Sequence, residues 1–157
     1  MNHSSTDPGR QDGAAVRSVY DLVLGSWANI DHDAGVGGEH FFASDGTCDM
    51  PAATMKGREE ISAGYARRQQ GGSRVSRHLV TNLFVDVLSP DRARARYNIV
   101  LYASRGTCPA PLTEPQAVVD VTDDCVQTGK AWLIQHRRLT TVFLSDIHDS
   151  VMLEPGS

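Results

Sequence analysis

The chain has 157 residues, of which 40% are hydrophobic and 22% are charged, and this length and composition are typical of one globular domain with its own core. Fifteen Lys and Arg residues against nineteen Asp and Glu residues give a formal net charge of −4, which argues against nucleic acid as the main partner. The three cysteines form no zinc or disulfide pattern and no apolar run has the length of a membrane span, so we expect a soluble cytoplasmic protein with reduced thiols.

The first predicted element is an amphipathic helix that follows a polar tail. Residues 1–11 contain Pro8 and Gly9 and are expected to be disordered. From about Asp12, apolar residues recur at spacings of three and four, which predicts a helix with one apolar stripe. The stripe consists of Val16, Val19, Tyr20, Val23, Trp27 and Ile30. At about 100° per residue, Asp31 falls beside Trp27 within this stripe, which is an unusual place for an acid.

The next segments alternate between turn signals and short elements. Glycines within residues 33–38 break the first helix, and a short second helix is expected over residues 39–43. Asp45-Gly46 indicates a turn before a short strand over residues 47–50. A further helix is predicted from Gly57 or Arg58, because Glu59 and Glu60 would complement the dipole of its first turn, and Gly71-Gly72 would end it.

The strand predicted over residues 76–87 is the most informative stretch of the chain. Its alternation places His78, Val80, Asn82, Phe84 and Asp86 on one face, and Arg77 through Val85 at odd positions on the other. Because both faces carry apolar residues, we expect a central strand that is covered on both sides. A histidine on a stiff strand can be held in a fixed position, which chemistry requires.

The remaining chain predicts an antiparallel sheet. Strands are expected over residues 93–103, near residues 117–122 and over residues 131–144, with a turn region at Asp123, Asp124 and Gly129. In the last strand, simple alternation groups His136 and Arg138 with Trp132 and Ile134, and we interpret the two polar residues as surface or interface groups. Helices followed by strands predict an α+β fold with helices on one face of a curved sheet, forming one domain over residues 12–145 with a C-terminal tail from 146.

Several of these segments, in this order, carry a resemblance to a known family. They are the helix ending in Asp31, residues 41–46 (Phe-Phe-Ala-Ser-Asp-Gly), 57–61 (Gly-Arg-Glu-Glu-Ile), 77–82 (Arg-His-Leu-Val-Thr-Asn), 95–97 (Ala-Arg-Tyr) and 132–134 (Trp-Leu-Ile). The chain resembles the SnoaL-like branch of the nuclear transport factor 2-like superfamily. The resemblance implies a cone-shaped fold, in which helices and a curved, mostly antiparallel sheet enclose one apolar pocket, usually in homodimers.

The resemblance also implies a candidate catalytic pair. Scytalone dehydratase and bile-acid dehydratase carry an aspartate at the end of the first helix and a histidine at the start of this strand, and Asp31 and His78 match these positions. The dehydratases have a tyrosine just before the aspartate and another on the short strand, where this chain has Ile30 and Met50 or a neighbour. Tyr97 or Tyr102 could supply a hydroxyl instead.

Asp31 and His78 suit acid/base chemistry, but a purely structural role would also explain them. An imidazole can remove a proton next to a carbonyl, and a carboxylate can orient the ring and stabilise its cation. The alternative is a helix-terminal aspartate and a core histidine bonded to the backbone. The residues expected to contact substrate are Tyr20, Trp27, Met50, Tyr65, Asn82, Phe84, Tyr97, Tyr102 and Trp132. Asp31-His32-Asp33 does not predict a metal site, because consecutive side chains diverge.

Two hypotheses for function follow. The first is a lyase or isomerase of the dehydratase or cyclase type, without a cofactor, acting on a small apolar metabolite that contains a carbonyl group. The second is a non-catalytic ligand-binding or structural subunit, because residues 77–82 also resemble the β subunits of aromatic-ring dioxygenases. Neither hypothesis involves nucleic acid or a membrane. We expect a homodimer or homo-oligomer, and a discrete homodimer that binds small apolar ligands would favour the first hypothesis.

Overall fold

The structure is a computed structural model that describes residues 8–112 and 114–146, with side chains from residue 13 onward. Its elements in chain order are α1 (Pro8–His32), the 3-10 helix η1 (Gly38–Phe41), β1 (Phe42–Met50), β2 (Ala53–Lys56), α2 (Gly57–Gln70), β3 (Arg74–Ser89), β4 (Arg92–Arg105), β5 (Ala117–Thr128) and β6 (Ala131–Leu144). Within this part of the chain, no helix has the length and apolar character needed to cross a membrane. Of the tails expected at 1–11 and 146–157, residues 1–7 and 147–157 lie outside the described residues, whereas residues 8–11 belong to α1, which begins earlier than expected.

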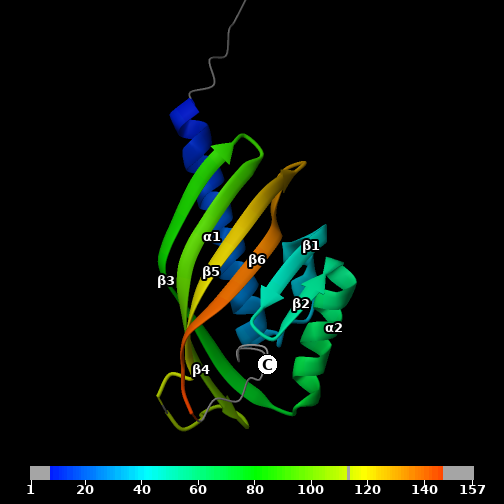
Figure 1. Cartoon of the computed structure of the whole chain (residues 1–157), viewed down its shortest axis with the longest axis vertical. Coiled ribbons are helices and arrows are strands. Elements are labelled where there is room, and N and C mark those ends of the chain that lie inside the picture. The colour runs from blue at the N-terminus through cyan, green and yellow to red at the C-terminus, as the bar shows by residue number, and fades with distance from the viewer. Residues whose placement is uncertain (1–7, 113, 147–157) are drawn as a thin grey trace, which may run out of the picture.

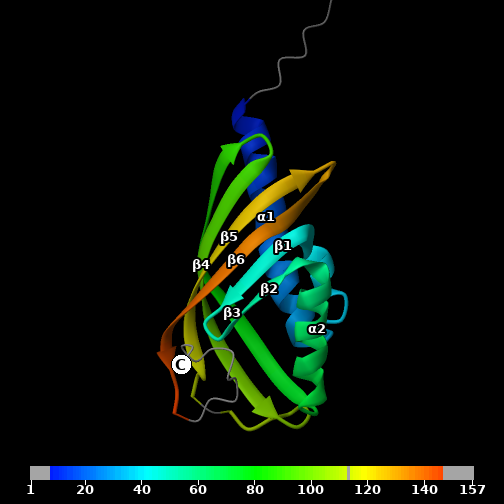
Figure 2. The same ribbon diagram turned by 45° about the vertical axis from the view of Figure 1, so that its right-hand side comes forward.

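The six strands form one mixed sheet, in the order β2-β1-β6-β5-β4-β3. All neighbouring pairs are antiparallel except β1 and β6, which are parallel. The sheet curves along α1, and α2 lies beside β1 and β2 (Figures 1 and 2). The expected α+β fold, with helices packed on a curved, mostly antiparallel sheet, is confirmed. Strand β2, which pairs with β1, was not foreseen in the sequence.

Helix α1 packs its apolar stripe against the concave face of the sheet. Val19, Val23, Trp27 and Ile30 are buried, as the spacing of three and four predicts. They join the core formed by the inward side chains of β4, β5 and β6. The stripe ends at Asp31, whose side chain therefore lies at the boundary between the core and the end of the helix.

Helix α2 begins where the sequence predicts, at Gly57. The Glu60 carboxylate accepts a hydrogen bond from the Lys56 backbone N–H at 2.7 Å, which satisfies a donor at the helix entrance. Arg58 donates from Nε and from a terminal nitrogen to the Phe42 carbonyl oxygen, at 2.9 and 2.7 Å. These bonds fix the start of α2 against the start of β1, so that the far end of α2 reaches the start of β3.

Strand β3 differs from the prediction in two ways. It is an edge strand rather than a central one, and its outer face is uncovered, which leaves Leu79, Phe84 and Leu88 exposed. Its pairing with β4 also shifts between Thr81 and Phe84, where Asn82 adopts a left-handed backbone with φ 53°. This bulge reverses the alternation. Residues 76, 78 and 80 point inward before it, whereas 83, 85 and 87 do so after it, and Phe84 is 68% exposed.

A second bulge reverses the alternation of β6. The register between β5 and β6 shifts between Asp124 and Cys125, opposite residues 134–136. As a result Arg137 points into the core, whereas His136 and Arg138 lie partly exposed on the opposite face. The turn expected at Asp123 and Asp124 is wrong, because β5 continues to Thr128 and Asp123 is fully buried.

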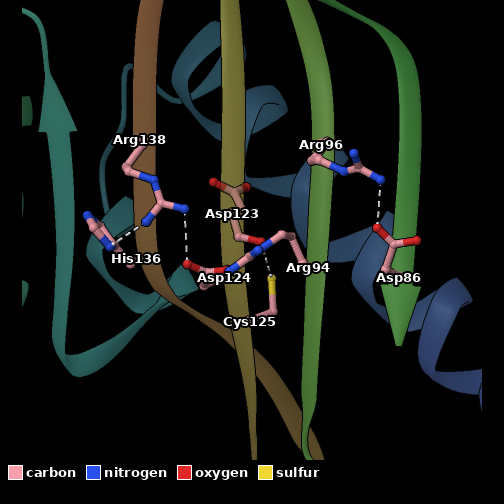
Figure 3. Close-up of polar contacts among 8 residues, drawn as sticks. All are labelled: Asp86, Arg94, Arg96, Asp123, Asp124, Cys125, His136 and Arg138. Carbon is pink, nitrogen blue, oxygen red and sulfur yellow. Dashed lines mark hydrogen bonds and ion pairs between the residues drawn. The ribbon is translucent and has the colours of Figure 1, made fainter. Parts of the chain in front are cut away.

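The convex face of the sheet carries a polar network that crosses β6, β5, β4 and β3 (Figure 3). Asp124 accepts hydrogen bonds from Arg94 at 2.7 Å and from Arg138 at 3.2 Å, and Arg96 donates to Asp86 at 2.8 Å. Exposed pairs of this kind contribute little to stability, because water and salt screen them. The network lies on the opposite side of the sheet from α1 and therefore does not contact the interior.

Gly35 packs closely against the Tyr65 ring, and its replacement with alanine tests how tight this packing is. It has φ +81°, and a Cβ atom there would lie 2.8 Å from Cγ of Tyr65. We expect Gly35→Ala to lower the free energy of unfolding by about 3 kcal/mol, because backbone strain and overpacking add. Gly129→Ala is the control, since Gly129 has φ +63° and no atom of the described residues lies within 4 Å of the new Cβ, and should cost about 1 kcal/mol. If urea unfolding shows the same loss of unfolding free energy for both variants, the Tyr65 ring does not hinder a side chain at position 35.

Candidate functional site

A cavity of about 420 Å³ lies between α1, α2 and the concave face of the sheet. Its apolar wall consists of Ile30, Met50, Met55, Ile99, Leu101, Val119 and Leu139. Trp27, Tyr65 and His78 bring an indole, a phenol and an imidazole to the same space. A mostly apolar cavity of this size with a few polar groups is the usual form of a small-molecule site.

Asp31 and His78 meet at the edge of this cavity. The His78 ring nitrogen Nδ1 lies 2.6 Å from Oδ1 of Asp31, and the His78 backbone N–H donates to Oδ2 at 2.7 Å. The Ser76 hydroxyl also donates to Oδ1 at 2.8 Å. The carboxylate is thus bound through both oxygens by β3, which holds the imidazole in one orientation. The side chains of Asp31 and His78 are only 6% and 11% exposed.

The surroundings define the protonation of this pair. Burial lowers the pKa of His78, and the opposing effect of the Asp31 carboxylate does not restore it to its ordinary value. Burial raises the pKa of Asp31, but its hydrogen bonds with His78 and Ser76 outweigh this and leave the pKa lowered. Near neutral pH, Asp31 is therefore ionised and His78 is neutral. Because a carboxylate only accepts, Nδ1 carries the proton and Nε2, on the other side of the ring, carries the lone pair.

Trp27 supports the imidazole from the side of α1. The two rings are stacked, with centroids 4.8 Å apart and planes inclined by 28°. The Trp27 N–H donates to the Tyr97 hydroxyl at 2.9 Å, and that hydroxyl donates to Asp123 at 2.9 Å. The guanidinium carbon of Arg137 lies 4.6 Å from the centroid of the Trp27 ring. The ring that stacks on His78 is therefore held by a buried polar network.

That network is centred on an ion pair in the core. Arg137 donates to both Asp123 oxygens, at 2.8 and 2.7 Å, and to the Ser26 hydroxyl at 2.9 Å. The two side chains of the pair are at most 1% exposed. Sequence reasoning missed both residues because it took Asp123 for a turn residue, and because simple alternation along the last strand groups Arg137 with Leu133 and Gln135 rather than with Trp132 and Ile134. The inward row Ala117, Val119, Val121, which continues to Asp123, is the signal that could have identified the acid.

The structure places only some of the other predicted site residues at the cavity. Trp27, Met50 and Tyr65 line the cavity together with His78. Tyr20, Asn82, Phe84, Tyr97, Tyr102 and Trp132 are not among its lining residues. Tyr20 donates to the Leu83 carbonyl oxygen, and Asn82 bonds to Asn98 on the exposed side of the sheet. The bulge in β3 explains the positions of Asn82 and Phe84, and the network around Arg137 takes up Tyr97.

The part of the chain that the structure describes brings together no group of three or more His, Cys, Asp or Glu side chains that could hold a metal ion. Asp31 is directed at Ser76 and His78, so it does not converge with its sequence neighbours His32 and Asp33 on one point.

Comparison with known proteins agrees with this architecture. The model of the SnoaL-like domain matches residues 12–138, and no curated protein matches the chain. A provisionally named scytalone dehydratase of Novosphingobium aromaticivorans superposes with a TM-score of 0.75 at 17% identity, covering 94% of this chain and 96% of the other. A nuclear transport factor 2-like protein with a cystatin-like fold from the same species gives 0.70 at 20% identity, covering 93% and 94%.

ActVI-ORFA of Streptomyces coelicolor is a third similar structure, with a TM-score of 0.68 at 18% identity, covering 80% of this chain and 96% of the other. At these identities the structural likeness shows the fold. The match to the family model extends over most of the chain and over both helices and nearly all of the sheet that encloses the cavity. The chain therefore belongs to the family of proteins with a SnoaL-like domain, and it has the nuclear transport factor 2-like, or cystatin-like, fold.

Proposed function

We propose that this protein is a lyase or isomerase of the dehydratase or cyclase type, which acts without a cofactor on an apolar metabolite containing a carbonyl group. The observation that carries the proposal is the neutral His78 ring, bound by Asp31 through Nδ1, at the wall of an apolar cavity. The family membership and the similarity to a provisionally named scytalone dehydratase support it.

In the proposed reaction, His78 acts first as a base. Its Nε2 removes a proton from the carbon next to the carbonyl group, and the C–H electron pair forms an enolate. Asp31 stabilises the imidazolium that results, and this interaction is strong because the pair is shielded from water. In a dehydration, the electron pair then forms the C=C bond as the β C–O bond breaks, and the imidazolium returns its proton to the leaving hydroxyl as water. In an isomerisation the proton returns to another carbon.

Tyr65 is the phenol that we assign to the carbonyl oxygen. It lines the cavity, and burial raises its pKa to about 12, so that its hydroxyl stays protonated and can donate a hydrogen bond. The sequence suggested Tyr97 or Tyr102 for this role. Tyr97, however, donates to Asp123 within the core, and Tyr102 is not among the cavity residues. In this proposal Tyr65 supplies the phenol that the dehydratases have at the positions of Ile30 and Met50.

The proposal is tested by hydrogen exchange in D₂O, with NMR detection, on bicyclic and tricyclic ketones that carry acidic α-hydrogens. We expect the wild-type protein to accelerate α-exchange. Its kcat/KM should rise with pH and level off, with a midpoint below about 6.5, because the base must be deprotonated and burial lowers the pKa of His78. No acceleration with any of these ketones, or a profile that falls as the pH rises through this range, would contradict the proposal.

The homodimer and the alternative role as a structural subunit stay predictions. Gel filtration with light scattering measures the first. Copurification with a large iron-sulfur subunit, together with no α-exchange, would favour the second.

A further inference from the structure

One end of the cavity is lined by arginines. Arg67 and Arg68 come from the last turn of α2, Arg74 from the start of β3 and Arg105 from the end of β4. No aspartate or glutamate is among the described residues that line the cavity. Asp31 lies behind His78, where its oxygens accept the bonds from Ser76 and His78. The described residues of the cavity wall therefore carry guanidinium groups at one end and mostly apolar side chains elsewhere.

The fold itself gathers these four side chains. Gly71 and Gly72 end α2 and turn the chain directly into β3, so that the last turn of the helix lies beside the first residue of the strand. Arg74 pairs in register with Arg105 across β3 and β4. Arg105 also donates to the Gly71 carbonyl oxygen at 2.8 Å, which joins the end of β4 to the end of α2. Three elements thus bring four guanidinium groups to one end of the cavity.

Arg68 reaches furthest toward the candidate catalytic pair. It donates to the Ser76 hydroxyl at 3.0 Å, and Ser76 in turn donates to Asp31. Burial and the charge of Arg74 lower the pKa of Arg68, and the opposing charge of Asp31 does not restore it, which means that the cation is poorly solvated. A guanidinium has five N–H donors in a planar fork, and such a group in a partly buried site is suited to bind a carboxylate through two bonds.

We infer that the ligand of this cavity carries a carboxylate or a comparable anionic oxygen at one end of an apolar ring system, and that Arg68 binds this group. The inference deepens the proposed function, because the anion would anchor the ligand and leave its apolar part against Trp27 and His78. The anionic group would also distinguish the ligand from neutral apolar compounds, which the apolar part of the cavity would bind equally well.

The test measures binding and needs no turnover. The probes are 2-naphthoate and 2-naphthamide, which have nearly the same shape and differ in charge, and titration calorimetry gives their dissociation constants. For the wild-type protein we expect 2-naphthoate to bind at least about 10-fold more tightly, because charge-assisted hydrogen bonds outweigh neutral ones. This preference should shrink as NaCl is raised from 20 to 500 mM, while the affinity for 2-naphthamide stays nearly constant.

Arg68→Gln should remove most of the preference for 2-naphthoate, by about 10-fold or more. Arg96→Gln is the matched control, because Arg96 lies on the convex face and pairs with Asp86 (Figure 3); it should keep the wild-type preference. Thermal unfolding of each variant confirms that it is folded. If Arg68→Gln does not fold, Arg68→Lys, which keeps the charge but loses the planar fork of donors and should weaken the preference, and the salt dependence of the wild-type protein carry the test.

Equal affinities for the two probes, no saturable binding of 2-naphthoate by 5 mM, or a preference that folded Arg68→Gln retains would each overturn the inference. This test can fail or succeed independently of the proposed function. His78→Gln removes the proposed base but keeps Arg68, so a folded His78→Gln variant should still prefer 2-naphthoate. Arg68-dependent binding without any α-exchange would leave the anion site standing and reject the enzyme.

Discussion

Replacing His78 with alanine should lower kcat by about 10²-fold to 10⁴-fold, because general base catalysis contributes an effect of this size. The ring lies in contact with Trp27 and Asp31 at the cavity wall, so its removal enlarges the cavity without exposing the inner core. We expect the variant to remain folded, with KM changed less than kcat. Single-turnover measurements on the ketone that shows the fastest α-exchange provide the check, and circular dichroism verifies the fold.

Asp31→Asn is the companion to this experiment. An amide in place of the carboxylate can donate to Nδ1, which would favour the tautomer with the proton on Nε2 and remove the lone pair from the cavity. The loss in kcat should therefore approach that of His78→Ala, although the two side chains remain nearly isosteric. Asp21→Asn is the control, since Asp21 lies on the same helix and forms an exposed pair with Arg17. If Asp31→Asn keeps the wild-type kcat, Asp31 is a structural residue.

The second large effect concerns stability. Arg137→Met should lower the free energy of unfolding by about 3–5 kcal/mol, because it leaves the Asp123 carboxylate charged and without its partner in the core. The Ser26 hydroxyl and the Trp27 ring also lose contacts with the guanidinium. Urea unfolding followed by fluorescence measures the change.

The neighbouring residue supplies a matched control for Arg137. Arg138 lies on the other face of β6, where its side chain is 41% exposed and pairs with Asp124, so Arg138→Met should cost less than about 1 kcal/mol. A double variant, Arg137→Met with Asp123→Leu, should recover much of the loss because it leaves neither member of the pair as an unpaired charge. If Arg137→Met and Arg138→Met cost the same, the buried ion pair does not contribute as the structure implies.

The sequence predicted most of the elements because their signals are local. The spacing of Val19, Val23, Trp27 and Ile30 places four side chains on one face of any helix, and this geometry does not depend on the rest of the protein. The same helical geometry placed Asp31 within the stripe. A resemblance in residues 77–82 then matched His78 with it, and the structure brings the two side chains into contact.

The sequence predicted which side chains of a strand point inward only as far as the first bulge. A bulge inserts one residue relative to the partner strand, so it is a property of two strands and leaves no mark in the alternation of one. The bulge near Asn82 therefore turned Phe84 to solvent, and the one beside Gln135 turned Arg137 into the core.

By itself the sequence determined the α+β class, the amphipathic first helix and the positions of an acid and a histidine, because these follow from periodicity within single elements. Only the tertiary structure decided that β3 is an edge strand, that Arg137 and Asp123 pair beneath Trp27, and that Arg67, Arg68, Arg74 and Arg105 share one end of a cavity. These features join residues that are distant along the chain, and strand order and register, which bring them together, are set by the packing of the whole sheet.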